Sequence, residues 1–134
     1  MNNILLDTNI LVYAIDMDSV FHQRAKQVLI DENNGLYTTS KNISEYFAVC
    51  SKKNVLPEVI WGFYEDIKQN TTILFPNVES LLLLEQLLKK YTPRGNRIYD
   101  VEIVSIALTN HITQIATVNI DDFRTITEIQ IVTI

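Results

Sequence analysis

The segment Asn3-Ile4-Leu5-Leu6-Asp7-Thr8-Asn9 decides the fold of this 134-residue chain. Its apolar run, residues 3–6, is too short for a helix and ends at an acid, so it predicts a buried strand. Residues 8–15 then predict a short helix that begins directly beyond the strand. A buried strand leading straight into a helix is the repeating unit of α/β proteins. In open sheets of this class, sites form beyond the carboxyl ends of the strands, which is where Asp7 stands.

Strands and helices continue to alternate along the rest of the chain. We predict helices over residues 20–30, 42–52, 57–67, 77–91 and 100–110, and strands over residues 36–39, 72–75, 115–118 and 130–134. Ser19 is the expected N-cap of the first of these helices, Pro57 suits a first helical turn, and residues 33–35 predict a turn. The alternation predicts one α/β domain over residues 1–134. Its expected architecture is a three-layer α/β/α sandwich with a mostly parallel sheet of about four to five strands.

Composition agrees with a single globular domain and excludes other classes. Apolar residues make up 47% of the chain and charged residues 20%, and with three Gly and three Pro no low-complexity linker is expected. Cys50 stands alone, which rules out an internal disulfide and agrees with a reducing cytoplasm. No apolar run approaches the ~20 residues that span a bilayer, and the first residues lack the basic stretch of a signal peptide. We therefore expect a soluble, cytoplasmic protein that makes no membrane contact.

Four acids stand at the ends of predicted strands or the starts of predicted helices. They are Asp7, Glu45, Asp100 and Asp122. Three of them follow predicted strands and Asp100 opens the helix before the fourth strand, so all four are expected at one edge of the sheet. Carboxylates gathered in this way bind Mg²⁺ or Mn²⁺. Such a centre suits hydrolysis of phosphodiesters, in which the metal activates water.

Each acid also has a purely structural explanation. Asp7 is a good helix N-cap, and Asn42-x-x-Glu45 fits a capping box. Asp100 suits the positive end of a helix dipole, and Asp121-Asp122 suits a polar turn before a short helix. Caps require no fixed order along the chain, however, and a helix N-terminus is itself a good place to fix a carboxylate. The structural and functional interpretations are therefore compatible.

The net charge of −5 is compatible with a nucleic-acid substrate. When the four candidate acids are set aside, 12 acids face 11 basic residues, so the overall acidity argues only against broad, non-specific binding. The segment between Glu85 and Asp100 contains no acid and has four basic residues: Lys89, Lys90, Arg94 and Arg97. It is either a solvated helix end and loop or a rim that guides phosphates toward Asp100.

The residues quoted above resemble those of PIN-domain nucleases, and most closely those of the VapC-type toxins of bacterial toxin–antitoxin pairs. The resemblance covers nearly the whole chain. It rests on Asp7-Thr8-Asn9, on Glu45 at the start of a helix, on Asp100-x-x-Ile103-x-x-x-Ala107, and on Thr117-x-Asn119-x-x-Asp122-Phe123. The last motif departs from the family pattern because its acid is doubled, so Asp121 competes for the fourth position. The register against Asn119 and Phe123 favours Asp122.

The resemblance implies a PIN-like nuclease domain over residues 1–134 and a metal-dependent endoribonuclease, the toxin of a toxin–antitoxin system. It implies that Asp7, Glu45, Asp100 and Asp122 are catalytic, and that Asp7 and Asp100 bind Mg²⁺ or Mn²⁺. Its expected partners are an RNA substrate, a cognate antitoxin and a second copy of the chain. It also suggests that Thr117 and Asn119 line the site.

Three alternatives remain. A catalytically silent PIN-like RNA-binding module would have lost one or more of the acids, and none is lost. A haloacid-dehalogenase-like phosphatase needs a second Asp two residues after the first, where this chain has Asn9. A receiver-like signalling domain clusters acids around a phospho-accepting Asp, and Glu45 and Asp122 do not fit that layout.

Overall fold

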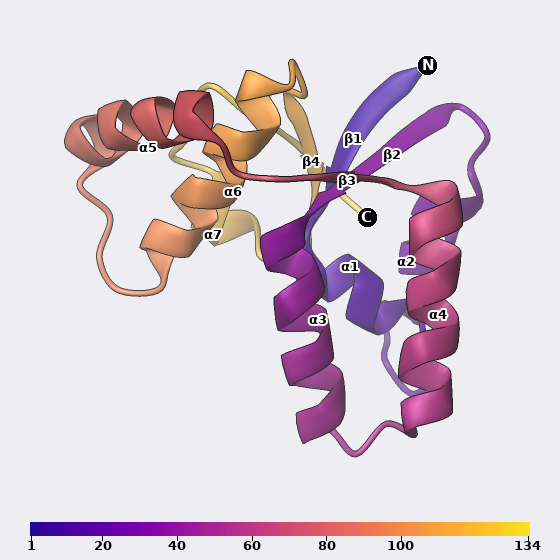
Figure 1. The fold of residues 1–134 in the computed structure, drawn as a ribbon. Coiled ribbons are helices and arrows are strands. Elements are labelled where there is room, and N and C mark those ends of the chain that lie inside the picture. The colour runs from indigo at the N-terminus through magenta and orange to yellow at the C-terminus, as the bar shows by residue number, and fades with distance from the viewer.

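Five parallel strands form one sheet at the centre of the computed structural model, which describes residues 1–134 (Figure 1). The strands are β1 (Asn2–Leu6), β2 (Asn34–Thr39), β3 (Thr72–Leu74), β4 (Gln114–Ala116) and β5 (Gln130–Val132). Their order is β3-β2-β1-β4-β5, so β1 lies in the middle and pairs with both β2 and β4. All four pairings are parallel. The predicted α/β fold with a mostly parallel sheet is therefore confirmed.

Seven helices cover the two faces of the sheet. They are α1 (Thr8–Tyr13), α2 (His22–Ile30), α3 (Ser40–Lys52), α4 (Pro57–Asn70), α5 (Val78–Tyr91), α6 (Arg97–Thr109) and α7 (Ile120–Phe123). In Figure 1, α1 to α4 lie on one side of the strands and α5 to α7 on the other. No helix is both long enough and apolar enough to cross a membrane.

The central strand divides the hydrophobic core into two parts because its side chains alternate between the two faces of the sheet. Ile4 and Leu6 pack with buried residues of α1 to α4. Leu5 instead packs with α6 and with Phe123 of α7. Leu5 and Leu6 are both fully buried, as expected for the centre of a parallel sheet. The sheet is thus the shared wall of two apolar cores.

Several predicted boundaries need correction. Asn34 and Gly35 belong to β2 and not to a turn, because they pair with Asn2 and Asn3 of β1. The helix predicted from Asp100 begins at Arg97, which places Asp100 in the first turn and not at the cap. Ser19 does not cap α2, because its hydroxyl accepts the N–H of Phe21 and the helix begins at His22. These errors concern ends of elements, where local polar contacts decide the boundary.

The start of α3 also differs from the prediction. The helix begins at Ser40, two residues before the predicted start, and its N-cap is Thr39. The capping box joins Thr39 to Asn42, and not Asn42 to Glu45. Glu45 therefore has no capping role in α3, and its carboxylate is free for other contacts. Pro57 does occupy the first turn of α4, as predicted.

Candidate active site

The structure brings all four candidate acids to one cleft beyond the carboxyl ends of the central strands. Asp7 directly follows β1, and its backbone N–H donates to the carbonyl of Ala116 at the end of β4. Glu45 reaches the cleft from α3, Asp100 from α6 and Asp122 from α7. The cleft has a volume of about 830 Å³. Residues far apart in sequence meet there because β1, β2 and β4 are neighbours in a parallel sheet.

Asp7 is buried and its carboxylate accepts four hydrogen bonds, the longest of them from the Asn42 amide to Oδ1 at 3.5 Å. One carboxylate oxygen, Oδ1, accepts the backbone N–H of Thr8 at 2.8 Å, so Asp7 does cap α1. The other oxygen, Oδ2, accepts the Thr117 hydroxyl at 2.8 Å and the Asn9 amide at 3.2 Å. Burial raises the pKa of Asp7, and the nearby charges of Glu45 and Asp122 raise it further, against the opposing effect of the Thr117 and Thr8 hydrogen bonds. The cap thus fixes a carboxylate that faces other carboxylates.

A buried polar chain positions Glu45 beside Asp7. The Thr8 hydroxyl donates to Glu45 Oε2 at 3.2 Å and accepts the Asn42 amide at 3.0 Å. Asn42 is fully buried, and its own carbonyl oxygen accepts the Thr39 hydroxyl at 2.7 Å. From the sequence, Asn42 is predicted only as a cap, and this positioning role is not predicted. The available signal was its place four residues before the buried Tyr46, on the apolar face of α3.

Asp100 faces the same uncompensated negative charge. Burial raises its pKa to about 7, and the charges of Asp122, Asp7 and Glu45 add to the shift, while Arg97 opposes it. Arg97 lies 4.0 Å from Asp122, between its Nη2 and the Asp122 Oδ1, and is the one basic residue of the predicted rim that approaches an acid of the cleft. Arg97 and the two lysines that line the cleft do not balance the five acids that line it. The cleft therefore has a deficit of positive charge.

The two adjacent acids, Asp121 and Asp122, differ in exposure and in whether they line the cleft. Asp122 lines the cleft, and 35% of its side chain is exposed. The Asp121 side chain is 74% exposed, forms an ion pair with Arg124 on the surface, and does not line the cleft. The register against Asn119 and Phe123 thus agrees with the placement of Asp122.

The donor set suits a hard divalent cation in chemical type. Every acidic ligand candidate supplies carboxylate oxygen. Burial raises the pKa values of Asp7 and Asp100, and neighbouring negative charge, which a cation would offset, raises them further. No three His, Cys, Asp or Glu side chains are arranged closely enough to form a ready coordination sphere. The residues therefore fit Mg²⁺ or Mn²⁺ by charge and ligand chemistry.

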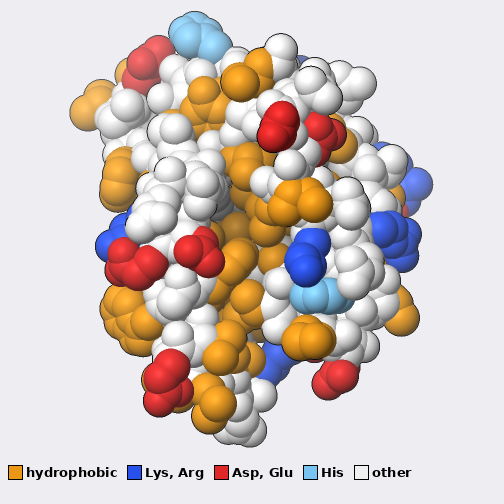
Figure 2. Space-filling model, turned by 90° about the vertical axis from the view of Figure 1, so that its right-hand side faces the viewer, with side chains coloured by type: hydrophobic (Ala, Val, Ile, Leu, Met, Phe, Trp, Pro, Cys, Tyr) orange, Lys and Arg blue, Asp and Glu red, His pale blue; other side chains and the backbone are white.

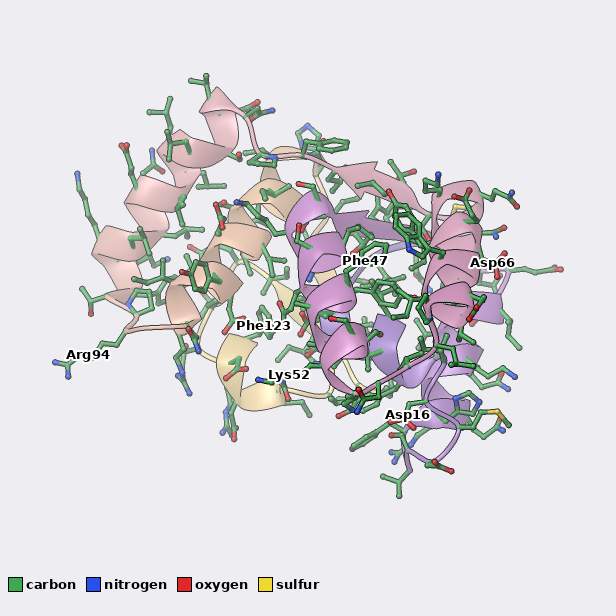
Figure 3. All side chains as sticks on the ribbon, turned by 60° about the horizontal axis from the view of Figure 1, so that its bottom comes forward. Asp16, Phe47, Lys52, Asp66, Arg94 and Phe123 are labelled. Atoms are coloured by element: carbon green, nitrogen blue, oxygen red, sulfur yellow. The ribbon has the colours of Figure 1, made fainter.

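The structure places most of the predicted basic segment elsewhere. Lys90 Nζ lies 2.8 Å from Glu128 Oε2, and Arg94 points outward from the loop after α5 (Figure 3). The lysines that line the cleft are Lys41 and Lys53, at the two ends of α3. The sequence did not indicate them, because Lys41 stands alone and nothing in the pair Lys52-Lys53 marks Lys53 as the residue that lines the cleft.

Comparison with known proteins places this fold and cleft in context. A model of the PIN domain family matches residues 4–129. The fold is similar to VapBC2 from Rickettsia felis, bound to a DNA fragment from its promoter, with 23% identity, 98% of each chain covered and a TM-score of 0.72. VapBC-1 from nontypeable Haemophilus influenzae has 25% identity over 98% of this chain and 97% of that one, with a TM-score of 0.69.

A third similar structure is VapC20 from Mycobacterium tuberculosis, a toxin that cleaves the sarcin–ricin loop. It has 11% identity over 84% of this chain and 86% of that chain, with a TM-score of 0.69. No curated protein sequence matches the chain. The structural neighbours include toxins of toxin–antitoxin systems.

Proposed function

Because the chain belongs to the PIN domain family, we propose that it is a metal-dependent endoribonuclease and the toxin of a toxin–antitoxin pair. The observation that carries this proposal is the meeting of Asp7, Glu45, Asp100 and Asp122 in one cleft that lacks balancing positive charge. RNA is the proposed substrate, supported by the similar fold of a toxin that cleaves the sarcin–ricin loop. A silent RNA-binding module is disfavoured because all four acids are present and face the cleft.

Asp7 and Asp100 are the proposed ligands of Mg²⁺ or Mn²⁺. A bound divalent cation would supply Lewis acidity, lowering the pKa of water and offsetting the charge that develops on the phosphate. Thr117, Asn9 and the N–H of Thr8 hold the Asp7 carboxylate in one orientation. Thr8 and Asn42 do the same for Glu45, so the chain supplies a preorganised set of acids. Asp122 lines the same cleft from α7.

RNA cleavage is expected to depend entirely on the divalent cation. The purified protein should cleave a structured RNA in Mg²⁺ or Mn²⁺, stop in excess EDTA, and recover when the metal is restored. Gel analysis of end-labelled RNA measures the result. The same RNA treated with Asp100→Asn protein is the control for contaminating ribonucleases. Cleavage that persists in EDTA at the level of the metal-loaded protein would contradict the proposal.

The metal requirement of cleavage should increase as the pH falls. A carboxylate must be deprotonated to bind a cation, and the pKa of Asp100 in the metal-free protein is about 7. The half-saturating Mg²⁺ concentration is therefore expected to rise as the pH is lowered from about 8 to about 6, and to change little above about 8. Titrating Mg²⁺ at each pH tests this, and a requirement that is constant over this range would count against Asp100 as a ligand.

The helices also expose apolar surface that fits protein partners. Leu81 and Leu82 of α5 are exposed, as are Val59 and Trp61 of α4. Figure 2 shows a separate apolar groove on the face formed by α2 and α4. The groove is lined by Ala14, Leu29, Ile30, Leu36, Phe63 and Ile67, with polar residues at its borders. Exposed apolar patches of this kind mark protein interfaces. We propose a homodimer and a cognate antitoxin as the partners. The antitoxin is supported by a structural neighbour from Klebsiella pneumoniae that was solved as a toxin–antitoxin complex.

Light scattering should give about twice the 15.4 kDa mass of the chain at tens of micromolar. Leu81→Glu with Leu82→Glu should lower that mass to the monomer, because charge is costly in an apolar interface. Val20→Glu, at an exposed apolar residue outside these helices, is the matched control and should leave the mass unchanged. A monomeric wild type with no small protein co-purifying from its own operon would refute the proposed partners.

A further inference from the structure

The cleft continues beyond the four acids along one face of α3. The residues of α3 and its C-cap that line it are Lys41, Ser44, Glu45, Ala48, Val49 and Lys53. Positions 41, 45, 49 and 53 are four residues apart and therefore share one face of the helix. At 1.5 Å per residue this face is about 18 Å long, which exceeds the span of one nucleotide. An acidic centre thus lies in a longer track with a lysine at each end.

The two lysines are only loosely engaged within the chain. Lys41 Nζ lies 3.9 Å from Glu102 Oε2, and Lys53 Nζ lies 3.7 Å from Asp16 Oδ2. Both lysine side chains are about half exposed, and exposed pairs at such distances contribute little to stability. Either ammonium is therefore available to an anion in the cleft. Because five acids and only these two lysines line the cleft, a polyanion needs these cations to enter it.

Tyr99 presents an aromatic ring to the same cleft. It directly precedes Asp100 in α6, lines the cleft and is 63% exposed. Two other rings are strongly exposed. Trp61 is 57% exposed but packs against Phe47 at 4.9 Å and against Tyr64, and Phe75 is 65% exposed but does not line the cleft. Tyr99 packs on no other aromatic ring. Among the strongly exposed rings, it is therefore the one that the cleft offers to a base.

We propose that the cleft holds single-stranded RNA along α3, with one base stacked on Tyr99 and backbone phosphates at Lys41 and Lys53. The inference rests on the proposed nuclease function and specifies how that site recognises its substrate. Sites for single strands combine cations that follow the backbone with aromatic rings on which bases stack. A base in a duplex is already stacked on its neighbours and is not available to Tyr99. The cleft therefore selects unpaired RNA without reading its sequence.

The stacked base is tested with a short single-stranded RNA that carries 2-aminopurine, a base whose fluorescence falls on stacking. Titration with metal-free protein at low salt should quench the fluorescence. Tyr99→Phe, which keeps the ring, should retain the quenching, and Tyr99→Ala should lose it and weaken binding about 5- to 100-fold. Phe75→Ala is the matched control, an exposed ring away from the cleft, and should behave as wild type. The same RNA annealed to its complement should not be quenched.

The lysines are tested by the salt dependence of binding. Lys53→Gln and Lys41→Gln should each reduce the slope of log affinity against log salt by about 1 and leave the 2-aminopurine quenching at saturation unchanged. Lys68→Gln, on α4, is the matched control with an unaltered slope. Quenching and affinity in Tyr99→Ala that match those in Phe75→Ala would overturn the stacking site, as would loss of quenching in Tyr99→Phe. Unaltered slopes in both cleft-lysine variants would overturn the phosphate contacts.

Measuring RNA binding and RNA cleavage separately distinguishes the proposed RNA-binding track from the proposed nuclease activity. Wild-type protein that cleaves RNA, with Tyr99→Ala unchanged in both KM and kcat, overturns the track and leaves the nuclease proposal standing. Wild-type protein that quenches the labelled single strand and does not cleave RNA with added Mg²⁺ overturns the nuclease activity and supports the track. A raised KM with a nearly constant kcat in Tyr99→Ala supports both.

Discussion

Replacing Asp100 with Asn is expected to reduce RNA cleavage to the background rate while the fold stays intact. The change is nearly isosteric. It removes a charge that burial, and then the neighbouring carboxylates, disfavour, as the raised pKa of about 7 indicates. Loss of a residue that merely supports a metal ligand costs about 10- to 100-fold, so loss of a ligand should exceed about 100-fold. Asp7→Asn and Glu45→Gln should have the same result. Single-turnover cleavage of a labelled RNA measures the loss.

Thermal melting separates this expectation from a structural role of the acids. The Asn and Gln variants should melt at or above the temperature of metal-free wild type, because each relieves repulsion between like charges. Asn is as good an N-cap as Asp, so a purely structural Asp7 would tolerate the change with activity unharmed. Full nuclease activity in Asp7→Asn would therefore refute the metal–carboxylate mechanism.

The doubled acid at the end of the chain offers a second large effect with its own control. Asp122→Asn is expected to reduce cleavage by about 100-fold or more, because Asp122 lines the cleft and adds to the charge around Asp7 and Asp100. Asp121→Asn should change the rate by less than about twofold, because its side chain is 74% exposed and paired with Arg124. The two variants have the same change in composition and net charge. Equal rates in the two variants would show that the fourth position is wrongly assigned.

The sequence predicts the sheet well because the decisive information is local. The run before Asp7 alternates between the two faces of the sheet, and the helical stripes that follow are long enough to be recognised. The ends of elements were less predictable. At the start of α3, both Thr39-x-x-Asn42 and Asn42-x-x-Glu45 fit a capping box, and the folded chain uses the first. Four acids in order were enough to locate the cleft.

The support of these acids was not predictable from the sequence. The Thr117 hydroxyl bonds Asp7 across 110 residues, and Asn42 bonds Thr8 across 34, so neither contact leaves a local pattern. The basic residues that line the cleft were not predictable from the sequence either. Lys90 and Arg94 belong to a visible basic segment but lie away from the cleft. Lys41, which stands alone, and Lys53, which follows Lys52, line the cleft because of the helical spacing of α3. Composition within a short window does not indicate which face of the molecule a charge occupies.

The two separate cores on either side of β1 have a consequence for when the chain is able to act. Glu45 is carried by the layer that packs on Ile4 and Leu6, whereas Asp100 and Asp122 are carried by the layer that packs on Leu5. The acids meet only where these layers converge, so neither half of the molecule contains a complete centre. A chain still emerging from the ribosome, or one that has lost either layer, therefore lacks part of the set of acids. Completion of the proposed centre is thus tied to completion of folding.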